Sequence, residues 1–134
     1  MSIVDEREWP LLVVRWGTES PTDEQFQAYL DHYAALLGRG QRYAIVFVTE
    51  PSAPMTKSKH AKLQATWMKE HYDELQKFCV GSAFVLPSPV MRGVLKAILA
   101  MQGMPVEYVV VSDEASGMEW AKSRMAKEGV RAAG

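Results

Sequence analysis

Short apolar segments alternate along the chain with longer segments in which apolar residues recur every three or four positions. The apolar or nearly apolar runs cover residues 11–14, 43–48, 83–86 and 106–111. Runs of this length, rich in β-branched and aromatic residues, are typical of strands buried on both faces of a sheet. A weaker run at 3–5 predicts a short edge strand that turns back and pairs with the first of them.

The segments between these runs carry the start and stop signals of four helices. Thr22, followed by Gln25 three residues later, has the spacing of a capping box, and Gly38 or Gly40 can end that first helix. The other helices are expected over residues 58–78, 90–102 and 114–128. The long second helix would carry an apolar stripe formed by Ala61, Ala65, Met68, Tyr72, Leu75 and Cys79.

Apolar strands separated by helices imply a single small α/β domain, STAS/SpoIIAA-like in the order of its elements. We expect a mostly parallel sheet of four to five strands, in which the 3–5 segment is an antiparallel edge strand, and about four helices. A chain of 134 residues has room for one hydrophobic core. The expected domain covers residues 1–128, with a frayed tail at 129–134.

Two groups of residues resemble bacterial STAS-like (SpoIIAA-like) proteins. One group is residues 9–16 (WPLLVVRW) followed by 21–26 (PTDEQF), and the other is residues 83–89 (AFVLPSP) with Arg92 and Gly93. The resemblance implies the STAS-like fold and a module that works by docking onto other proteins.

The same resemblance implies a candidate regulatory serine. Anti-sigma-factor antagonists of the STAS group are switched by phosphorylation of a serine in the loop after a central strand. The matching loop here is 49–54, with Ser52 in roughly the corresponding place. Prolines flank Ser52, and the glycine that follows the serine in the family pattern is missing. Ser52 is either a phosphorylation site or an ordinary loop serine.

Composition and charge narrow the function classes. The chain has 15 Lys and Arg against 16 Asp and Glu, a formal net charge of -1, so bulk charge does not draw it to nucleic acid or acidic membranes. The single cysteine, Cys79, excludes an intramolecular disulfide and suits a reducing compartment. No apolar stretch approaches the roughly 20 residues of a membrane span, and no signal peptide is visible. We expect a soluble, cytoplasmic protein.

The residues that carry chemistry form no recognisable site in the sequence. His60 and His71 share one helical segment but lie about 16 Å apart along its axis, too far for one metal ion. Cys79 is expected at the C-terminal end of the long helix, where the helix dipole opposes thiolate formation. Glycine-rich phosphate loops and nucleophile elbows are missing. The sequence predicts no catalytic residue, cofactor or metal, and no cleft where reactive side chains gather.

Two surfaces are candidates for contact with a partner. The third helix is apolar around more than one face, whereas packing on a sheet needs a stripe of only about 100°. The second helix begins with a basic cluster, near a tryptophan that falls one step off the apolar stripe and should be half exposed. The candidate partner-binding residues are Met91, Leu95, Ile98 and Met101 on the third helix, and Lys59, Lys62 and Trp67 on the second.

These features favour a non-enzymatic regulatory module that docks onto a protein partner and forms a homodimer, with no nucleic acid or membrane as partner. One alternative is a cytoplasmic immunity or adaptor protein for a single effector. Another is a binder of a small apolar ligand between the sheet and the third helix, whose surplus apolar surface would form a wall of the site. An enzyme is the least favoured interpretation, because the sequence brings no reactive groups together.

Overall fold

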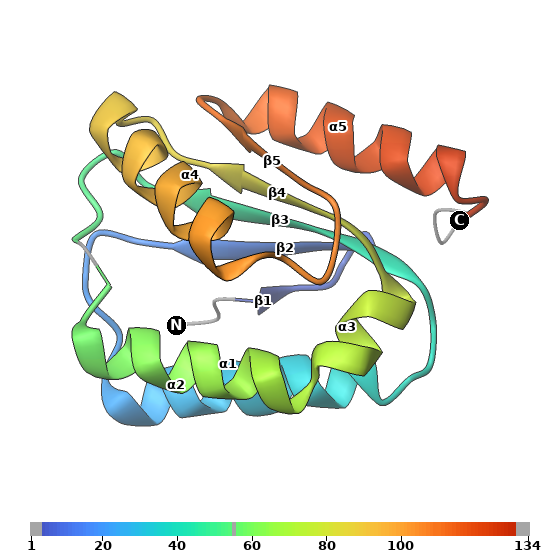
Figure 1. Ribbon diagram of the computed structural model, residues 1–134, viewed down its shortest axis with the longest axis horizontal. Coiled ribbons are helices and arrows are strands. Elements are labelled where there is room, and N and C mark those ends of the chain that lie inside the picture. Colours follow the sequence, from blue (N-terminus) through green and yellow to red (C-terminus); the bar gives the residue numbers. More distant parts are fainter. Residues whose placement is uncertain (1–3, 55, 131–134) are drawn as a thin grey trace.

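A five-stranded mixed sheet runs through the middle of the protein (Figure 1). The computed structural model describes residues 4–54 and 56–130 of the 134-residue chain, and the following elements are those of the described residues. The strands are β1 (Val4–Asp5), β2 (Leu11–Trp16), β3 (Tyr43–Thr49), β4 (Cys79–Val85) and β5 (Tyr108–Val111). The helices are α1 (Asp23–Leu37), α2 (Ser58–Glu70), α3 (Tyr72–Phe78), α4 (Pro89–Gln102) and α5 (Glu114–Lys127).

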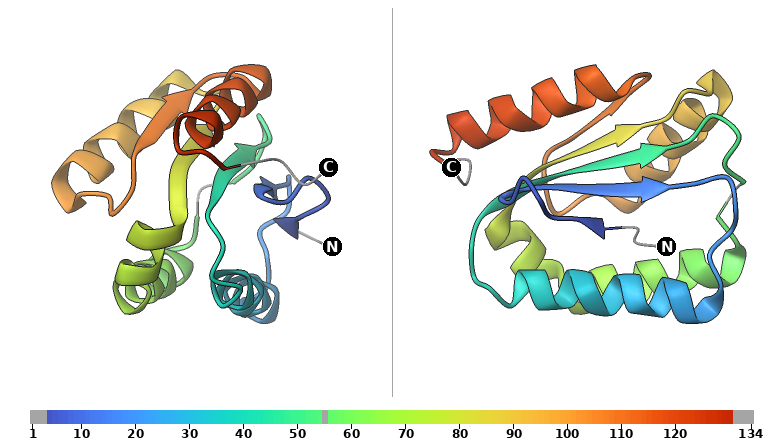
Figure 2. Two further views of the ribbon diagram at one scale, coloured as in Figure 1. Left: turned by 90° about the vertical axis from the view of Figure 1, so that its right-hand side faces the viewer. Right: turned by 180° about the vertical axis from the view of Figure 1, so that it is seen from behind.

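The strands lie side by side in chain order. β1 pairs antiparallel with β2, and β2 to β5 run parallel to one another. Each parallel pair is joined by a helical crossover, and crossovers of one hand that step in the same direction place their helices on the same face. α1, α2, α3 and α4 accordingly lie on one side of the sheet, whereas α5 covers the other (Figure 2). The predicted small α/β domain with a largely parallel sheet is confirmed, and so is the antiparallel edge strand at Val4–Asp5; Ile3 lies outside the described residues.

The long second helix expected over 58–78 is wrong, because the chain forms two helices there. α2 ends at His71, where the backbone leaves helical geometry with φ -108° and ψ 16°, and α3 starts at the next residue. The break turns the chain toward the sheet, so that Cys79 begins β4 and pairs with Tyr43 of β3 instead of ending a helix. Pairing between strands therefore overrides the helical spacing that runs on to Cys79.

Two boundaries in the last third of the chain also differ from expectation. β5 begins at Tyr108, so residues 106–107 belong to the preceding loop and not to the strand expected over 106–111. At the end of α5, the Val130 backbone N–H donates to the carbonyl oxygen of Met125 over 2.8 Å, and Val130 packs against the core beside it. Residues 129–130 of the expected tail are therefore held in place, and residues 131–134 lie outside the described residues.

α5 packs closely on its face of the sheet. Two glycines allow the close approach: a Cβ at Gly117 would lie 2.7 Å from Cγ2 of Val85, and one at Gly81 would lie 2.9 Å from the Trp120 ring. The buried core here consists of short or flexible side chains, among them Leu11, Val13, Ala44, Val46, Val48, Ala83, Val85, Ala121 and Met125. Direct contact between helix and strands closes this face.

The other face is covered by large aromatic side chains. α1 starts with the predicted capping box between Thr22 and Gln25 and ends at Gly38. It presents Phe26, Tyr29 and Tyr33 to the sheet, all of them buried. Bulky rings at this spacing hold α1 and α2 apart from the strands.

Candidate apolar binding cavity

A cavity of about 520 Å³ lies between the sheet and the helices of the α1–α4 side. Its lining comes from segments that are far apart in the sequence: the carboxyl ends of β2, β3 and β4, the inner sides of α1 and α2, and α4. Pockets for small organic ligands typically measure roughly 300–1,000 Å³ and are lined mainly by apolar side chains. Both the size and the position of this cavity fit that class of site.

Apolar side chains make up most of the lining. Phe47 and Phe84 from neighbouring strands stack with their ring centroids 5.1 Å apart and form a floor on the sheet. α1 and α2 contribute Phe26, Tyr29, Tyr33, Ala61, Ala65, Trp67 and Met68. The facing wall is formed by Met91, Val94, Leu95, Ile98 and Leu99 of α4.

α4 forms one wall of the cavity and packs only loosely against the rest of the protein. Leu99 is the only buried residue among the described side chains of this helix. Val94 and Ile98 line the cavity and are still 43% and 42% exposed, while Val90 and Met101 on the outer side are 75% and 89% exposed. The helix is thus apolar toward the cavity and apolar toward water.

The ends of α4 are better fixed than its middle. Ser88 caps the first turn, and the Arg92 guanidinium donates to the carbonyl oxygens of Leu86 and Pro87 over 2.8 and 2.9 Å. At the other end Gly103, with φ 73°, turns the chain into the loop that leads to β5. Between these ends α4 buries only Leu99 among its described side chains, so few buried contacts hold the helix along its length.

One histidine lies in the wall of this cavity. His60 is 1% exposed, stacks on Phe26 at a centroid distance of 4.4 Å, and donates from Nε2 to Oδ1 of Asp23 over 2.9 Å. Lys59 donates to the other oxygen of Asp23 over 2.6 Å. Both hydrogen bonds lower the pKa of the Asp23 carboxyl, and the one from Lys59 lowers it more than the one from His60. Asp23 is therefore charged at neutral pH and fixes the orientation of the imidazole.

His60 is held in place from two sides. No hydrogen bond to its Nδ1 atom occurs within residues 4–54 and 56–130. At 1% exposure the ring is one of the fully buried side chains, so stacking on Phe26 and the hydrogen bond to Asp23 fix it in the wall of the cavity.

The inner end of the cavity is polar but uncharged. The Tyr33 and Tyr43 hydroxyls are 2.7 Å apart, and Sγ of Cys79 lies 3.5 Å from the Gly81 carbonyl oxygen and 3.6 Å from Oγ of Ser82. Burial raises the pKa of the Cys79 thiol and raises the pKa of Tyr33 well above its usual value. The thiol is therefore protonated at neutral pH, which makes it a poor nucleophile.

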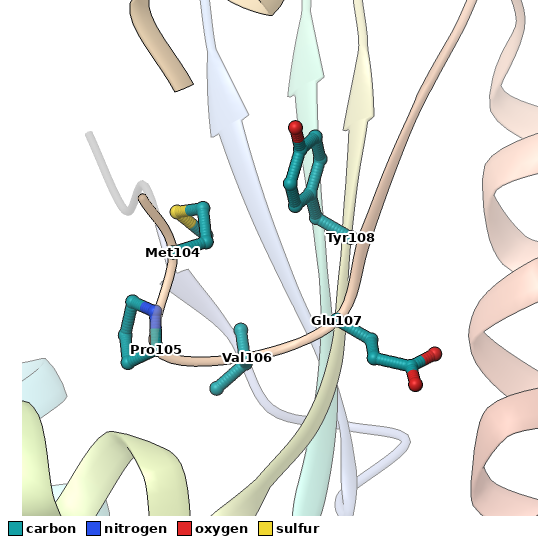
Figure 3. Close-up of a pocket in the computed structure, with 5 residues that line it drawn as sticks. All are labelled: Met104, Pro105, Val106, Glu107 and Tyr108. Carbon is teal, nitrogen blue, oxygen red and sulfur yellow. The ribbon is translucent and has the colours of Figure 1, made fainter. Parts of the chain in front are cut away.

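A second, open depression lies on the surface beside the cavity. Figure 3 shows the five consecutive residues that line it, 104–108. The side chains of Glu107 and Tyr108 leave the chain in different directions (Figure 3), and Glu107 pairs with Arg124 of α5 at 3.4 Å. A depression lined by one continuous segment brings no separate elements together, and we do not regard it as a site.

The structure divides the predicted partner-binding residues among three environments. Met91, Leu95 and Ile98 line the cavity, whereas Met101 points away from it and is exposed. Lys62 is exposed on α2, and Lys59 is paired with Asp23. Ser52 lies on the exposed loop after β3.

The expectation that Trp67 is half exposed is wrong. Trp67 is only 7% exposed, lies 4.8 Å from the Tyr33 ring and 4.3 Å from the His71 ring, and lines the cavity. The buried side of α2 is built on His60 and Trp67, seven residues apart, and not on the predicted stripe that starts at Ala61. An apolar pattern cannot include a buried histidine, so the sequence pointed one residue away from the true face.

The sequence did not identify His60 as a lining residue, although one of its alternatives was a ligand site between the sheet and the third helix. No group of three His, Cys, Asp or Glu residues that could hold a metal ion occurs in the described part of the chain. No helix within that part is long and apolar enough to cross a membrane. Comparison of the chain with protein-family models, with curated proteins and with solved structures gives no match.

Proposed function

We propose that this protein binds a small apolar molecule in the cavity between the sheet and α4, and serves as its carrier or sensor. The observation that carries this proposal is the cavity itself, about 520 Å³ lined mainly by aromatic and aliphatic side chains. An apolar hollow of this size leaves apolar surface in contact with water, and a bound apolar ligand would cover that surface.

The behaviour of α4 supports the same function. The cavity is partly open to solvent beside α4, because Val94 and Ile98 line it and are half exposed. α4 buries only Leu99 among its described side chains, so few contacts oppose the entry of a ligand along this helix. A bound apolar molecule would add contacts to the inner side of α4 and would stabilise the folded state by an amount that grows with the logarithm of its concentration once this exceeds Kd.

A fluorescence titration with a neutral apolar probe, N-phenyl-1-naphthylamine, tests this function. We expect saturable binding and an emission increase in the native protein. Ala65→Trp fills space in the cavity and should weaken binding at least about tenfold, whereas the control Ala126→Trp, on the exposed side of α5, should leave it unchanged. Equal binding by both variants, or no saturable binding by the native chain, contradicts the proposal. Circular dichroism confirms that each variant is folded.

A second candidate function, docking of a protein partner in the manner of STAS-like modules, is favoured by the outer side of α4. Val90 and Met101 are large apolar side chains at 75% and 89% exposure, which is uncommon for an isolated monomer unless the surface has a use. The strands follow one another across the sheet in chain order, which is compatible with the proposed STAS-like relationship. Multi-angle light scattering of the native chain and of Met101→Asp tests the homodimer: a dimeric mass lost in the variant supports it, and a monomeric mass for both contradicts it.

A further inference from the structure

The free edge of the sheet at β5 is an interaction surface that does not depend on a ligand in the cavity. We propose that two copies of this chain pair their β5 strands antiparallel about a two-fold axis at Val109, which joins the two five-stranded sheets into one continuous sheet. The proposal rests on the homodimer of the second candidate function and assigns an interface to it.

β5 is an edge strand without the usual protection. It ends the sheet between α4 and α5 (Figure 2), and all four of its residues are at least partly exposed, whereas most residues of β2, β3 and β4 are buried. The opposite edge, β1, has only two residues and includes Asp5, whose carboxylate pairs with Arg7. Charges, prolines and bulges keep an edge from pairing with another chain, and β5, with the sequence YVVV and a regular register, has none of them.

The backbone of β5 has hydrogen-bonding groups on its open side. The Ser82 backbone N–H donates to the carbonyl oxygen of Glu107 over 2.9 Å. Because successive residues of a strand turn their backbone groups to alternate sides, the odd-numbered residues bond to β4, and Tyr108 and Val110 direct their N–H and C=O groups outward. None of these outward groups has a hydrogen-bond partner in the part of the chain that the structure describes.

A second copy of β5 satisfies all of these groups at once. With the axis at Val109, Tyr108 lies opposite Val110 of the partner subunit, and Val110 lies opposite Tyr108 of the partner subunit. Each such pair exchanges both of its N–H···O bonds, so that no outward donor or acceptor of the strand is left unpaired. A contact in which the same patch serves both copies closes on itself and gives a dimer instead of a filament.

The side chains of β5 suit this pairing. Tyr108 is 37% exposed, and its ring lies 6.4 Å from the Phe84 ring on the α4 side of the sheet. An aromatic residue directly opposite a β-branched residue is a stabilising pair between antiparallel strands. The contact with Val110 of the partner subunit therefore covers apolar surface that is exposed in the single chain.

Charge favours the axis at Val109 over its neighbour. Glu107 and Asp113 are the charged residues closest to the ends of β5. An axis at Val110 would place Glu107 opposite Asp113 of the partner subunit, and like charges directly opposite each other are destabilising. The axis at Val109 places an apolar residue opposite Glu107 instead.

Light scattering over a range of protein concentrations tests the edge with two variants at one position. Val110→Pro removes an outward N–H that no group of its own chain uses, whereas the matched control Val110→Thr keeps this N–H and a β-branched side chain. We expect Val110→Pro to weaken the dimer at least about tenfold and Val110→Thr to retain it. Circular dichroism confirms that each variant is folded. Equal dimer stability in the two variants overturns the β5 interface and leaves the homodimer intact, and a native chain that is monomeric at every concentration overturns both.

Substituted cysteines locate the axis without removing any backbone hydrogen bond. With the axis at Val109, the two Cβ atoms at this position lie about 5 Å apart, close enough for a disulfide. Val111→Cys is the matched control, because Val109 and Val111 are both partly buried on the α5 side and the two copies of position 111 lie about 13 Å apart. The native Cys79 is buried.

We expect oxidised glutathione to convert Val109→Cys to a disulfide-linked dimer on non-reducing gels, while Val111→Cys and the native chain stay monomeric there. Equal crosslinking of the two variants, or none in Val109→Cys while the native chain is dimeric, overturns the proposed pairing. A dimer that is lost in Met101→Asp and retained in Val110→Pro lies on the outer side of α4 and overturns it as well.

Discussion

The two faces of the sheet are packed by different rules. On the α5 face, small side chains and two glycines bring a helix into direct contact with the strands, with a hypothetical Cβ at Gly117 only 2.7 Å from Val85. On the opposite face, large rings and a loosely packed α4 surround a cavity of about 520 Å³. The same strands supply both faces, so the difference comes from the helices.

This contrast assigns different tasks to the two faces. Dense packing gives the domain its stability, and the loss of it at one face has to be compensated at the other. One helix, α5, packs along β3, β4 and β5 and closes that face of the sheet. The face under α4 contains the cavity instead. Equivalent substitutions on the two faces should therefore have unequal effects.

The largest difference is expected for removal of a leucine. Leu11 is buried on the α5 face and Leu99 is the buried residue of α4 beside the cavity. Leu11→Ala should lower the free energy of unfolding by about 3–4 kcal/mol, because a rigid surround leaves a void. Leu99→Ala should cost no more than about 1–2 kcal/mol, since its neighbours are already loosely packed. Urea unfolding followed by circular dichroism measures both, and equal losses would show that the faces do not differ.

The reverse change, adding volume, should show the next largest effect. Ala121 is fully buried under α5, whereas Ala65 lines the cavity. Ala121→Leu should destabilise by about 2–3 kcal/mol through overpacking. Ala65→Leu should change the stability by less than about 1 kcal/mol, since the added atoms enter existing space. A large loss in Ala65→Leu would mean that the cavity is not accessible to new side-chain volume.

A glycine-to-alanine pair should give changes of opposite sign. At Gly93 in α4 nothing lies within 4 Å of an added Cβ, so Gly93→Ala should raise the stability by about 0.5–1 kcal/mol through helix propensity. At Gly117 the added Cβ meets Val85, and the clash should exceed the propensity gain, for a net loss of about 1 kcal/mol. The same unfolding experiment decides between them. A gain at both positions would show that α5 moves away from the sheet without cost.

The smallest effects concern the ion pairs that tie helices on each face. Arg15 holds Glu114 with two hydrogen bonds of 2.7 and 3.2 Å and lowers the pKa of Glu114, as Lys59 and His60 do for Asp23. A carboxyl whose pKa is lower in the folded state stabilises the fold above its unfolded pKa, and this stabilisation is lost as the pH falls through that range. Stability should therefore decline below about pH 4.5.

Variants separate the two contributions to this acid dependence. Because solvent screens the Arg15–Glu114 pair, Glu114→Gln should cost less than about 1 kcal/mol at pH 7 and should flatten part of the decline. Asp23→Asn should have a smaller effect on stability, because solvent screens the exposed Asp23 carboxyl as well. Thermal unfolding at pH 7 and pH 4 provides the comparison. If both variants lose stability at pH 4 as much as the native chain does, these pairs are excluded as the source of the acid dependence.

The sequence predicted the part of the fold that depends on local pattern. Strand runs such as 43–48 and the capping box at Thr22 were confirmed because their signals are contained within a few residues. The break at His71 was missed, since the helical spacing continues through it and only the pairing of Cys79 with β3 ends the helix. A ligand site between the sheet and the third predicted helix was only one of several alternatives for a related reason: whether an apolar helix packs on a sheet or stands away from it depends on the rings beneath it.

The candidate site was only partly predictable. The surplus apolar surface of the third predicted helix singled out Met91, Leu95 and Ile98 as partner-binding residues, and the structure places all three in the lining of the cavity. His60 was judged by the spacing of metal ligands and set aside, because a histidine on a helix gives no signal of its depth. Its partner, Asp23, lies 37 residues away in the chain, and only the packing of α1 against α2 brings them together.

The consecutive strand order has a consequence for synthesis of the chain. Every parallel strand pairs with the one made just before it, so β2, β3 and β4 can assemble while the ribosome is still extending the polypeptide. α5 is made last and covers the surface of β3, β4 and β5, which means that a nascent chain ending before residue 114 exposes that face of its sheet to solvent or to a chaperone. A translation pause near that point would prolong the exposure and favour aggregation.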